Sequence, residues 1–232
     1  MNSIHPSAQL SGEVSIGTGN VIGPLAVIVG PVTIGDNNWI GIGAVIGGPP
    51  EVRDWAHPQD ALELSAGNGI AIGNGNTIRE YVQIHQGWEG VTRIEDDVFL
   101  MNQSYVAHDC TVEKRSTLAA GVLLGGHVRV GADANLGLGA IVHQRRYIGA
   151  GVMVGMGSVV TRDLPPFAKA YGNPARVRGA NTVGMKRAGI PEDAIALAVS
   201  IYGRTYDRAL SALNGQPGLD QALVAWRLHA AS

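Results

Sequence analysis

An aliphatic residue recurs at every sixth position along most of this 232-residue chain, and the run from Ile94 to Val160 is unbroken. A period of six fits neither the turn of an α-helix nor the two-residue alternation of an ordinary strand. It is typical of a hexapeptide parallel β-helix, in which each hexad forms one short strand and one turn. We expect three hexads in each triangular coil and coils stacked about 4.8 Å apart. The inward positions of the run are Ile94, Leu100, Val106, Val112, Leu118, Leu124, Val130, Leu136, Val142, Ile148, Val154 and Val160.

Small residues occur where a narrow interior needs them. They follow four positions after most aliphatic residues: Ser104, Cys110, Ser116, Val122, Val128, Ala134, Ala140 and Ser158. Arg146 breaks this rule, so we expect a bulge or a subunit interface there. Cys110 is expected to be a buried filler rather than a nucleophile. The 33 glycines suit tight turns, because glycine adopts positive φ at little cost.

The repeat begins at Ile4 and is interrupted twice. It fails over residues 47–71, which contain three prolines, and it slips by four residues over 86–92. Long loops inside a compact repeat are usually functional, so we interpret both segments as projecting excursions. We expect the β-helix to occupy residues 1–175.

The pattern changes after Val160 and becomes helical. Pro191 and the two acids that follow it predict a first helical turn, and a turn-rich break at 214–218 precedes a last short helix. We predict an α-helical cap over residues 176–232, since the end of a solenoid is otherwise a bare sheet edge. The residues expected on the packed faces are Ile195, Ala198, Val199, Tyr202 and Tyr206, followed by Leu219, Leu223, Trp226 and Leu228.

The composition of the chain argues against several partners and cellular locations. A net charge of −2 provides no basic field for nucleic acid, and a single cysteine excludes an intrachain disulfide. The opening residues lack the charged and apolar regions of a signal peptide, and no apolar run reaches the roughly 20 residues of a membrane span. We expect a cytoplasmic protein with no nucleic-acid partner and no membrane segment. Charged residues make up only 16% of the chain, which favours burial of surface in an oligomer.

Four histidines are spaced to meet at one edge of such a prism. His127 and His143 follow His108 by 19 and 35 residues, close to one and two coils, and His85 joins them once the four-residue slip is subtracted. One interpretation is a general base, because imidazole titrates near neutral pH. A second is a metal site like that of the trimeric β-helical carbonic anhydrases, although Ile148 stands where their third histidine is expected. A third is a subunit contact, above all for His85 and His143.

The stretch 106–112, Val-Ala-His-Asp-Cys-Thr-Val, resembles the acyl-ACP:UDP-N-acetylglucosamine O-acyltransferases of lipid A synthesis. The similarity also covers residues 76–80, 84–85, 126–128, 142–144, 163–166, 172–173 and 184–187. The resemblance implies an all-β fold, a left-handed parallel β-helix with a small C-terminal α-helical domain. It also implies a homotrimer with active sites between subunits. The implied reaction moves an acyl group, with a 3-hydroxyacyl group as one candidate, from an acyl carrier protein to a hydroxyl of a nucleotide sugar. The acyl-phosphopantetheine carrier is then a co-substrate, with no bound cofactor and no metal.

The resemblance also implies roles for individual residues. His108 is the general base, Asp109 orients it, and the Gly126 amide holds the oxyanion. Met156 stands where the family limits acyl length, and a methionine there is associated with chains of about ten carbons, since an unburied methylene forfeits binding energy. The residues implied to bind substrate are Tyr105, His127, His143, Gln144, Asn181 and Arg187.

Four positions depart from the family pattern. Tyr105 replaces a second histidine, Val183 an acid that contacts the nucleotide, and Ala188 an arginine near the acyl donor. The fourth departure is in the first excursion, which lacks a clear match to the family's Asp and Lys that hold the sugar nucleotide, with Asp60 as the candidate for the acid. These departures favour a divergent member acting on a related nucleotide sugar. Two alternatives stay open: an acyl- or acetyl-CoA-dependent N-acyltransferase on a nucleotide amino sugar, and a non-catalytic ligand-binding β-helix trimer.

Overall fold

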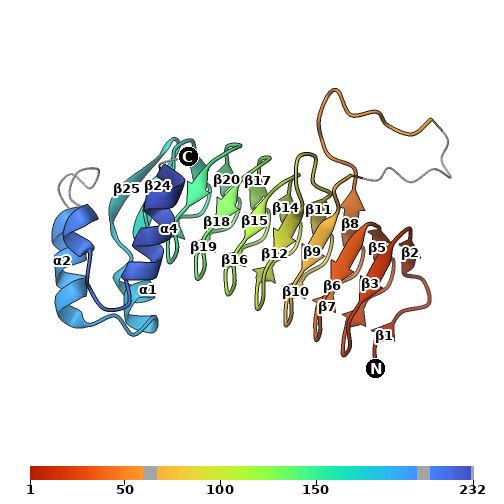
Figure 1. The fold of residues 1–232 in the computed structure, drawn as a ribbon, viewed down its shortest axis with the longest axis horizontal. Coiled ribbons are helices and arrows are strands. Elements are labelled where there is room, and N and C mark those ends of the chain that lie inside the picture. Colours follow the sequence, from red (N-terminus) through yellow and green to blue (C-terminus); the bar gives the residue numbers. More distant parts are fainter. Residues whose placement is uncertain (60–66, 203–209, 231–232) are drawn as a thin grey trace.

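The computed structural model is a parallel β-helix closed at one end by helices (Figure 1), and it describes residues 1–59, 67–202 and 210–230. Within this part of the chain the strands form three sheets. Sheet A has the order β1 (Ser3–Ile4), β4 (Val21–Ile22), β7 (Trp39–Ile40), β10 (Thr77–Ile78), β13 (Phe99–Leu100), β16 (Thr117–Leu118), β19 (Asn135–Leu136), β22 (Met153–Val154), β24 (Ala168–Gly172) and β25 (Ala175–Ala180). Sheet B has the order β2 (Gln9–Ser11), β5 (Val27–Val29), β8 (Val45–Gly48), β11 (Gln83–His85), β14 (Tyr105–Val106), β17 (Leu123–Leu124), β20 (Ile141–Val142) and β23 (Val159–Val160). Sheet C contains β3 (Val14–Ile16), β6 (Val32–Ile34), β9 (Ile70–Ile72), β12 (Thr92–Ile94), β15 (Thr111–Val112), β18 (Arg129–Val130) and β21 (Tyr147–Ile148).

The register of the sheets confirms a coil of eighteen residues. Val106 pairs with Leu124, and Leu124 pairs with Val142. Partners on sheet A are 38 residues apart across the first excursion, where Trp39 meets Thr77, and 22 apart across the second, where Thr77 meets Phe99. The excursions therefore add 20 and 4 residues to otherwise regular coils.

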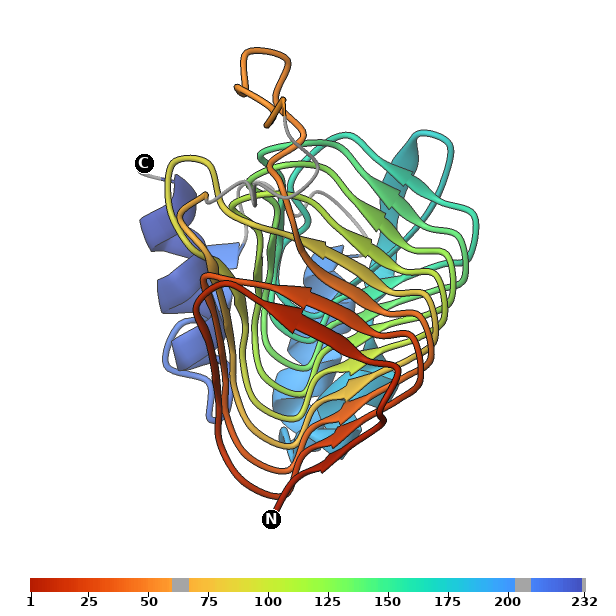
Figure 2. The same cartoon turned by 90° about the vertical axis from the view of Figure 1, so that its right-hand side faces the viewer.

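In Figure 2 the N-terminal end faces the viewer and the chain turns anticlockwise as it recedes, so the β-helix is left-handed.

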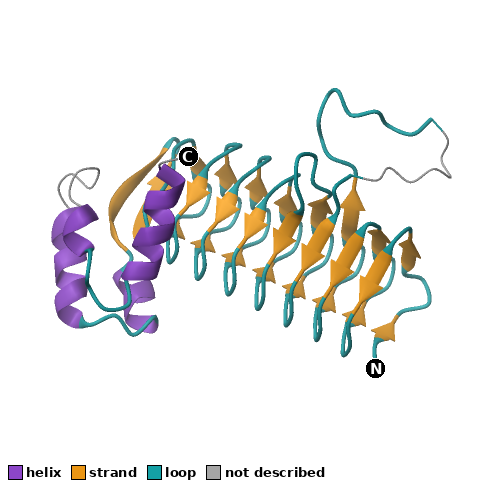
Figure 3. Cartoon of the chain, viewed as in Figure 1, coloured by secondary structure: helices purple, strands orange, loops and turns teal. Residues whose placement is uncertain are grey.

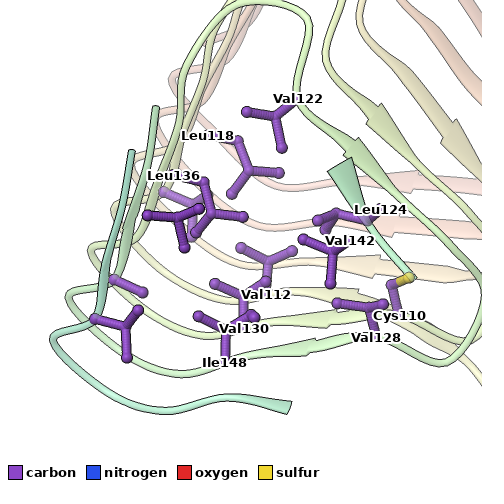
Figure 4. Close-up of a cluster of buried hydrophobic side chains, with 14 of the residues drawn as sticks. Cys110, Val112, Leu118, Val122, Leu124, Val128, Val130, Leu136, Val142 and Ile148 are labelled. Atoms are coloured by element: carbon purple, nitrogen blue, oxygen red, sulfur yellow. The ribbon is translucent and has the colours of Figure 1, made fainter. Parts of the chain in front are cut away.

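The interior is filled by the residues that the repeat predicts. All twelve aliphatic residues of the unbroken run are at most 1% exposed, and all eight small residues are equally buried. Figure 4 shows them stacked in columns, such as Val112, Val130 and Ile148. Each buried aliphatic side chain contributes about 2 kcal/mol relative to exposure, so the columns hold the coils together. Ile4 and Leu10 are 42% and 38% exposed, because no coil lies beneath the first one.

Cys110 and Arg146 occupy equivalent positions and behave differently. Cys110 is fully buried, its thiol donates to the Gly125 carbonyl at 3.2 Å, and burial raises its pKa to about 12. It is a filler, as predicted. Arg146 turns outward to Asp163, with Nη1 and Oδ1 3.3 Å apart. The predicted bulge is wrong, because β18 and β21 pair in unbroken register beside it.

The C-terminal part differs from the prediction in three ways. β24 and β25 form an antiparallel hairpin that extends sheet A, and β25 crosses the predicted boundary between residues 175 and 176. A short helix, α1 (Thr182–Arg187), precedes α2 (Glu192–Tyr202), η1 (Leu210–Leu213) and α4 (Asp220–Ala230), which Figure 3 shows in purple apart from η1. Val199 and Leu228 were expected to be packed but are 46% and 69% exposed.

The remaining predicted helix contacts are present in the described residues. Ile195, Ala198 and Tyr202 are buried, as are Leu219 and Leu223, whereas Tyr206 lies outside the described residues. α4 packs along the prism through Trp226, whose ring stacks on Tyr147 with centroids 5.7 Å apart. Within the described ranges, every helix is too short or too polar to cross a bilayer.

Candidate active site

The four predicted histidines lie at the corner where the chain passes from sheet B to sheet C. His108 and Asp109 occupy the turn between β14 and β15. The His108 Nδ1 lies 2.7 Å from the Asp109 Oδ2, so this nitrogen donates to the carboxylate and Nε2 is left as the acceptor. Both side chains are largely shielded, with 13% and 6% exposure. An imidazole oriented in this way is suited to remove a proton through Nε2.

Asp109 is held by the second excursion. Its Oδ1 accepts hydrogen bonds from three consecutive amides, Trp88 at 3.1 Å, Glu89 at 3.0 Å and Gly90 at 2.7 Å. Burial alone would raise the pKa of Asp109, but the hydrogen bonds from His108, Gly90 and Trp88 outweigh it and the pKa is lowered. The carboxylate therefore stays ionised near neutral pH, where it stabilises positive charge on His108.

His127 stands one coil above His108. The two rings meet edge to face with centroids 5.1 Å apart. Burial lowers the pKa of His127, and Arg145 and His108 lower it further, which favours the neutral ring. The His127 Nε2 lies 3.3 Å from the Arg145 guanidinium and 3.6 Å from the Asp109 Oδ2, so this nitrogen faces both a donor and an acceptor.

Gly126 closes the space directly above the His108 ring. A Cβ at this position would lie 2.5 Å from the His108 Nε2, so no larger residue fits without moving the ring. The Gly126 amide donates to no acceptor in the part of the chain that the structure describes. A free N–H beside a basic imidazole can hold an oxyanion that forms there.

The predicted substrate residues fall into two separate groups. Tyr105, His143 and Gln144 line a mainly apolar pocket of about 440 Å³ on sheet B, next to the histidine corner. Asn181 and Arg187 line a different pocket of about 530 Å³ against sheet A. A single chain does not bring the two groups together.

Asn181 has a structural role in this chain. Its Oδ1 accepts from the Gly184 amide at 3.1 Å and caps α1, while its Nδ2 donates to the Gly151 carbonyl at 2.9 Å. Both ends of the side chain are therefore already engaged, whereas the Arg187 side chain is exposed on the same pocket.

Comparison with known proteins identifies the family. Residues 163–223 match the family described as UDP N-acetylglucosamine O-acyltransferase, domain 2, and residues 92–126 match the bacterial transferase hexapeptide family. The acyl-[acyl-carrier-protein]–UDP-N-acetylglucosamine O-acyltransferase of Burkholderia lata is 40% identical over 157 residues, which are 66% of this chain and 60% of that protein. The chain thus spans about 60% of the length of the curated relatives it matches.

Solved structures extend the match over almost the whole chain. The UDP-N-acetylglucosamine acyltransferase of Campylobacter jejuni is 29% identical with a TM-score of 0.78, and the match covers 95% of this chain and 92% of that one. The UDP-N-acetylglucosamine O-acyltransferase of Moraxella catarrhalis RH4 is 30% identical with a TM-score of 0.71, covering 96% of this chain and 95% of that one. This chain belongs to the UDP-N-acetylglucosamine O-acyltransferase family.

The positions at which this family member departs from the pattern do not cluster in one place. Tyr105 lies beside His85, with ring centroids 5.1 Å apart, at the histidine corner. Val183 and Ala188 line the pocket that holds Arg187. Met156 is 75% exposed on the turn after β22, at the corner between sheets A and B, away from His108. Asp60 lies outside the described residues.

The donor set of this corner does not suit a metal ion. His108, Asp109 and His127 offer ligand atoms within 4.8 Å of one another. The Asp109 oxygens, however, already accept from His108 and from three amides, and the His108 Nδ1 faces the carboxylate. Binding a cation would require these hydrogen bonds to be given up.

Three charged residues near His108 were not predicted. Glu51, from the first excursion, accepts from the His108 amide at 3.3 Å, and Glu89, from the second, has an oxygen 3.8 Å from the His127 Nε2. Arg145 contacts the same His127 nitrogen. Arg145 follows His127 by eighteen residues, so the coil length could have placed it there.

Proposed function

We propose that this chain transfers an acyl group from an acyl-carrier thioester to a hydroxyl of UDP-N-acetylglucosamine or a closely related nucleotide sugar. The observation that carries the proposal is the 2.7 Å contact between the His108 Nδ1 and Asp109, beside the free amide of Gly126. Membership of a family whose named relatives are O-acyltransferases supports this chemistry.

In the proposed reaction His108 acts as the general base. Its Nε2 removes the proton of the acceptor hydroxyl while the oxygen attacks the thioester carbon. Asp109 keeps the proton on Nδ1 and stabilises the imidazolium that forms. Because its carboxylate has a lowered pKa, Asp109 remains charged throughout the cycle.

Attack creates a tetrahedral intermediate with a negatively charged oxygen. The Gly126 amide is the donor placed to hold this oxygen, an interaction worth roughly 3 kcal/mol in comparable sites. The intermediate then collapses, the carbon–sulfur bond breaks, and His108 returns its proton to the departing phosphopantetheine thiolate. The chain binds no cofactor or metal in this scheme.

A homotrimer would unite the two groups of substrate residues. Arg187 is assigned to the nucleotide, since the Asn181 side chain already caps α1, while His127, His143, Gln144 and Tyr105 are assigned to the sugar and the adjoining acyl group. These groups lie on different sides of one prism, so a site between adjacent subunits brings them together. We place the reaction in the cytoplasm, with an acyl carrier protein as the donor.

Acyl length is assigned to Met156. Its exposed side chain is free to close a groove formed with a neighbouring subunit, and chains of about ten carbons are the expected donors. A longer chain would leave methylenes unburied at this barrier.

The test measures transfer from a panel of C4 to C14 acyl carrier thioesters to a panel of nucleotide sugars. We expect transfer to UDP-N-acetylglucosamine or a near relative, and we expect His108→Ala to reduce the rate at least about 100-fold. Met156→Gly, assayed on the same panel, should shift the preference towards longer donors. Acylation only at an amine, or only from coenzyme A, would support the N-acyltransferase instead. Ligand binding without turnover of any thioester would support a non-catalytic trimer.

A further inference from the structure

His85 is held by two acceptors of the first excursion. Its Nδ1 lies 2.9 Å from the Pro49 carbonyl, and its Nε2 lies 3.4 Å from the Glu51 Oε1. The ring also leans on Tyr105 from β14. A neutral imidazole donates from one nitrogen only, whereas the imidazolium donates from both. Both ring nitrogens of His85 therefore face an acceptor of the first excursion.

Glu51 connects His85 to the catalytic turn. Its Oε1 faces His85, and its Oε2 accepts a hydrogen bond from the His108 amide. The His85 and Glu51 side chains are 17% and 28% exposed, so the pair is partly shielded from solvent. The carboxylate thus joins the long excursion to two successive coils at the residue that carries the base.

The second excursion makes a matching contact on the other side of the same turn. Its three amides hold the Asp109 carboxylate, and Thr92 accepts from the Asp109 amide at 2.9 Å. Each interruption of the repeat therefore fixes one member of the His108–Asp109 pair. A contact this local has no evident use for folding of the prism, whose core is complete without it.

We propose that Glu51 and His85 are positioning residues, an inference that rests on the proposed acyl transfer. His85 holds Glu51, and Glu51 fixes the main chain of His108 so that Nε2 is presented to the acceptor. The groups that face His85 are the Pro49 carbonyl and Glu51 carboxylate from the excursion and the Tyr105 ring from β14.

The kinetic test compares Glu51→Ala and Glu51→Gln. Glu51→Ala should lower kcat about tenfold, in line with loss of a shielded charged contact. Glu51→Gln should stay within about threefold, because its carbonyl oxygen can still accept from the His108 amide.

A matched control lies in the same excursion. Asp54 is exposed, and Asp54→Asn should match the wild-type kcat. If Glu51→Ala retains wild-type kcat, or if Glu51→Gln loses as much activity as Glu51→Ala, the positioning role is wrong.

A second measurement does not depend on activity. Hydrogen–deuterium exchange at the His108 amide should be faster in Glu51→Ala and His85→Phe than in the wild type, since both changes weaken its acceptor. If both variants exchange faster than the wild type but the wild type turns over no thioester, the proposed function is wrong and the contact between Glu51 and the His108 amide still stands. If the wild type is active but the variants exchange at the wild-type rate, only the role of the contact between Glu51 and the His108 amide is wrong.

Discussion

At the scale of single residues, the His108 ring determines what position 126 can hold. A Cβ there would lie 2.5 Å from Nε2, so Gly126→Ala must displace the imidazole from its contact with Asp109. We expect kcat to fall at least about 100-fold, as for loss of a general base. Gly139→Ala is the matched control. It strains a backbone with φ of +64° but meets nothing within 4 Å, so it should lower the melting temperature and retain kcat. A Gly126→Ala enzyme with wild-type kcat would contradict this account.

The lowered pKa of Asp109 predicts how the stability of the fold depends on pH. Its pKa is lower in the folded chain, so its contribution to stability is complete above the unfolded pKa of about 4 and is lost as pH falls through the folded value. Asp109→Asn should therefore lower the melting temperature clearly at pH 7. The difference from wild type should shrink as the pH falls below about 4. Thermal melts of both proteins at each pH test this. An equal difference in melting temperature at all pH values would show that the Asp109 charge does not stabilise the fold.

Spacing predicted part of the candidate site and missed the rest for a physical reason. A β-helix converts an interval of eighteen residues into adjacency, so His108, His127 and His143 could be grouped from their spacing, whereas Gly126 was implied only by the family resemblance. Glu51 and Glu89 lie on excursions without a period, and their positions depend on how each loop folds back. Arg145 could have been placed beside His127 from its spacing of eighteen residues, but an arginine in a turn is ordinarily interpreted as a solvent-exposed charge.

At the scale of elements, the second excursion is four extra residues in an otherwise regular coil. Deleting residues 87–90 restores the hexad spacing between Ile84 and Ile94 and removes the amides that hold Asp109. We expect a folded β-helix, checked by circular dichroism, with kcat reduced at least about 100-fold. Trp88→Ala keeps the amide and removes only the indole, which meets His108 edge-on at 6.2 Å, so it should be much milder. Unfolding of the deletion variant would show that the loop belongs to the core.

The C-terminal elements show where periodicity stops being informative. The sequence predicted α2 through its proline and acids but gave no sign of the β24–β25 hairpin, because that pair is stabilised by adding to sheet A rather than by its own pattern. Val199 falls on the helical stripe yet is exposed, since the described neighbours of α2 cover only its Ile195, Ala198 and Tyr202 side. Packing partners, and not spacing, decide which apolar residues are buried there.

At the scale of the whole molecule, an exposed apolar ridge runs along the corner between sheets A and B. Its members are 41% to 75% exposed and form two groups: Leu25, Ile42 and Tyr81 in three successive coils, and Leu138 and Met156 in two further coils. The turns of the two coils between these groups carry residues 102–103 and 120–121, which are polar or small. Exposed apolar groups of this kind often mark contact surfaces. The low share of charged residues in the sequence is consistent with a ridge that is covered by neighbouring copies.

The ridge provides the test of the proposed trimer. Leu138→Asp places a charge within the ridge, and burying an unpaired carboxylate in a subunit contact costs several kcal/mol, so the variant should dissociate into monomers. Sedimentation velocity measures this directly. Thr33→Asp adds the same charge to the exposed face of β6 on sheet C and should leave the oligomer intact. Dissociation should also abolish acyl transfer, because the groups around His108 and Arg187 would then remain on separate surfaces. A monomeric Leu138→Asp variant with full activity would place the whole site within one chain, and a variant that stays trimeric would move the interface to another face of the prism.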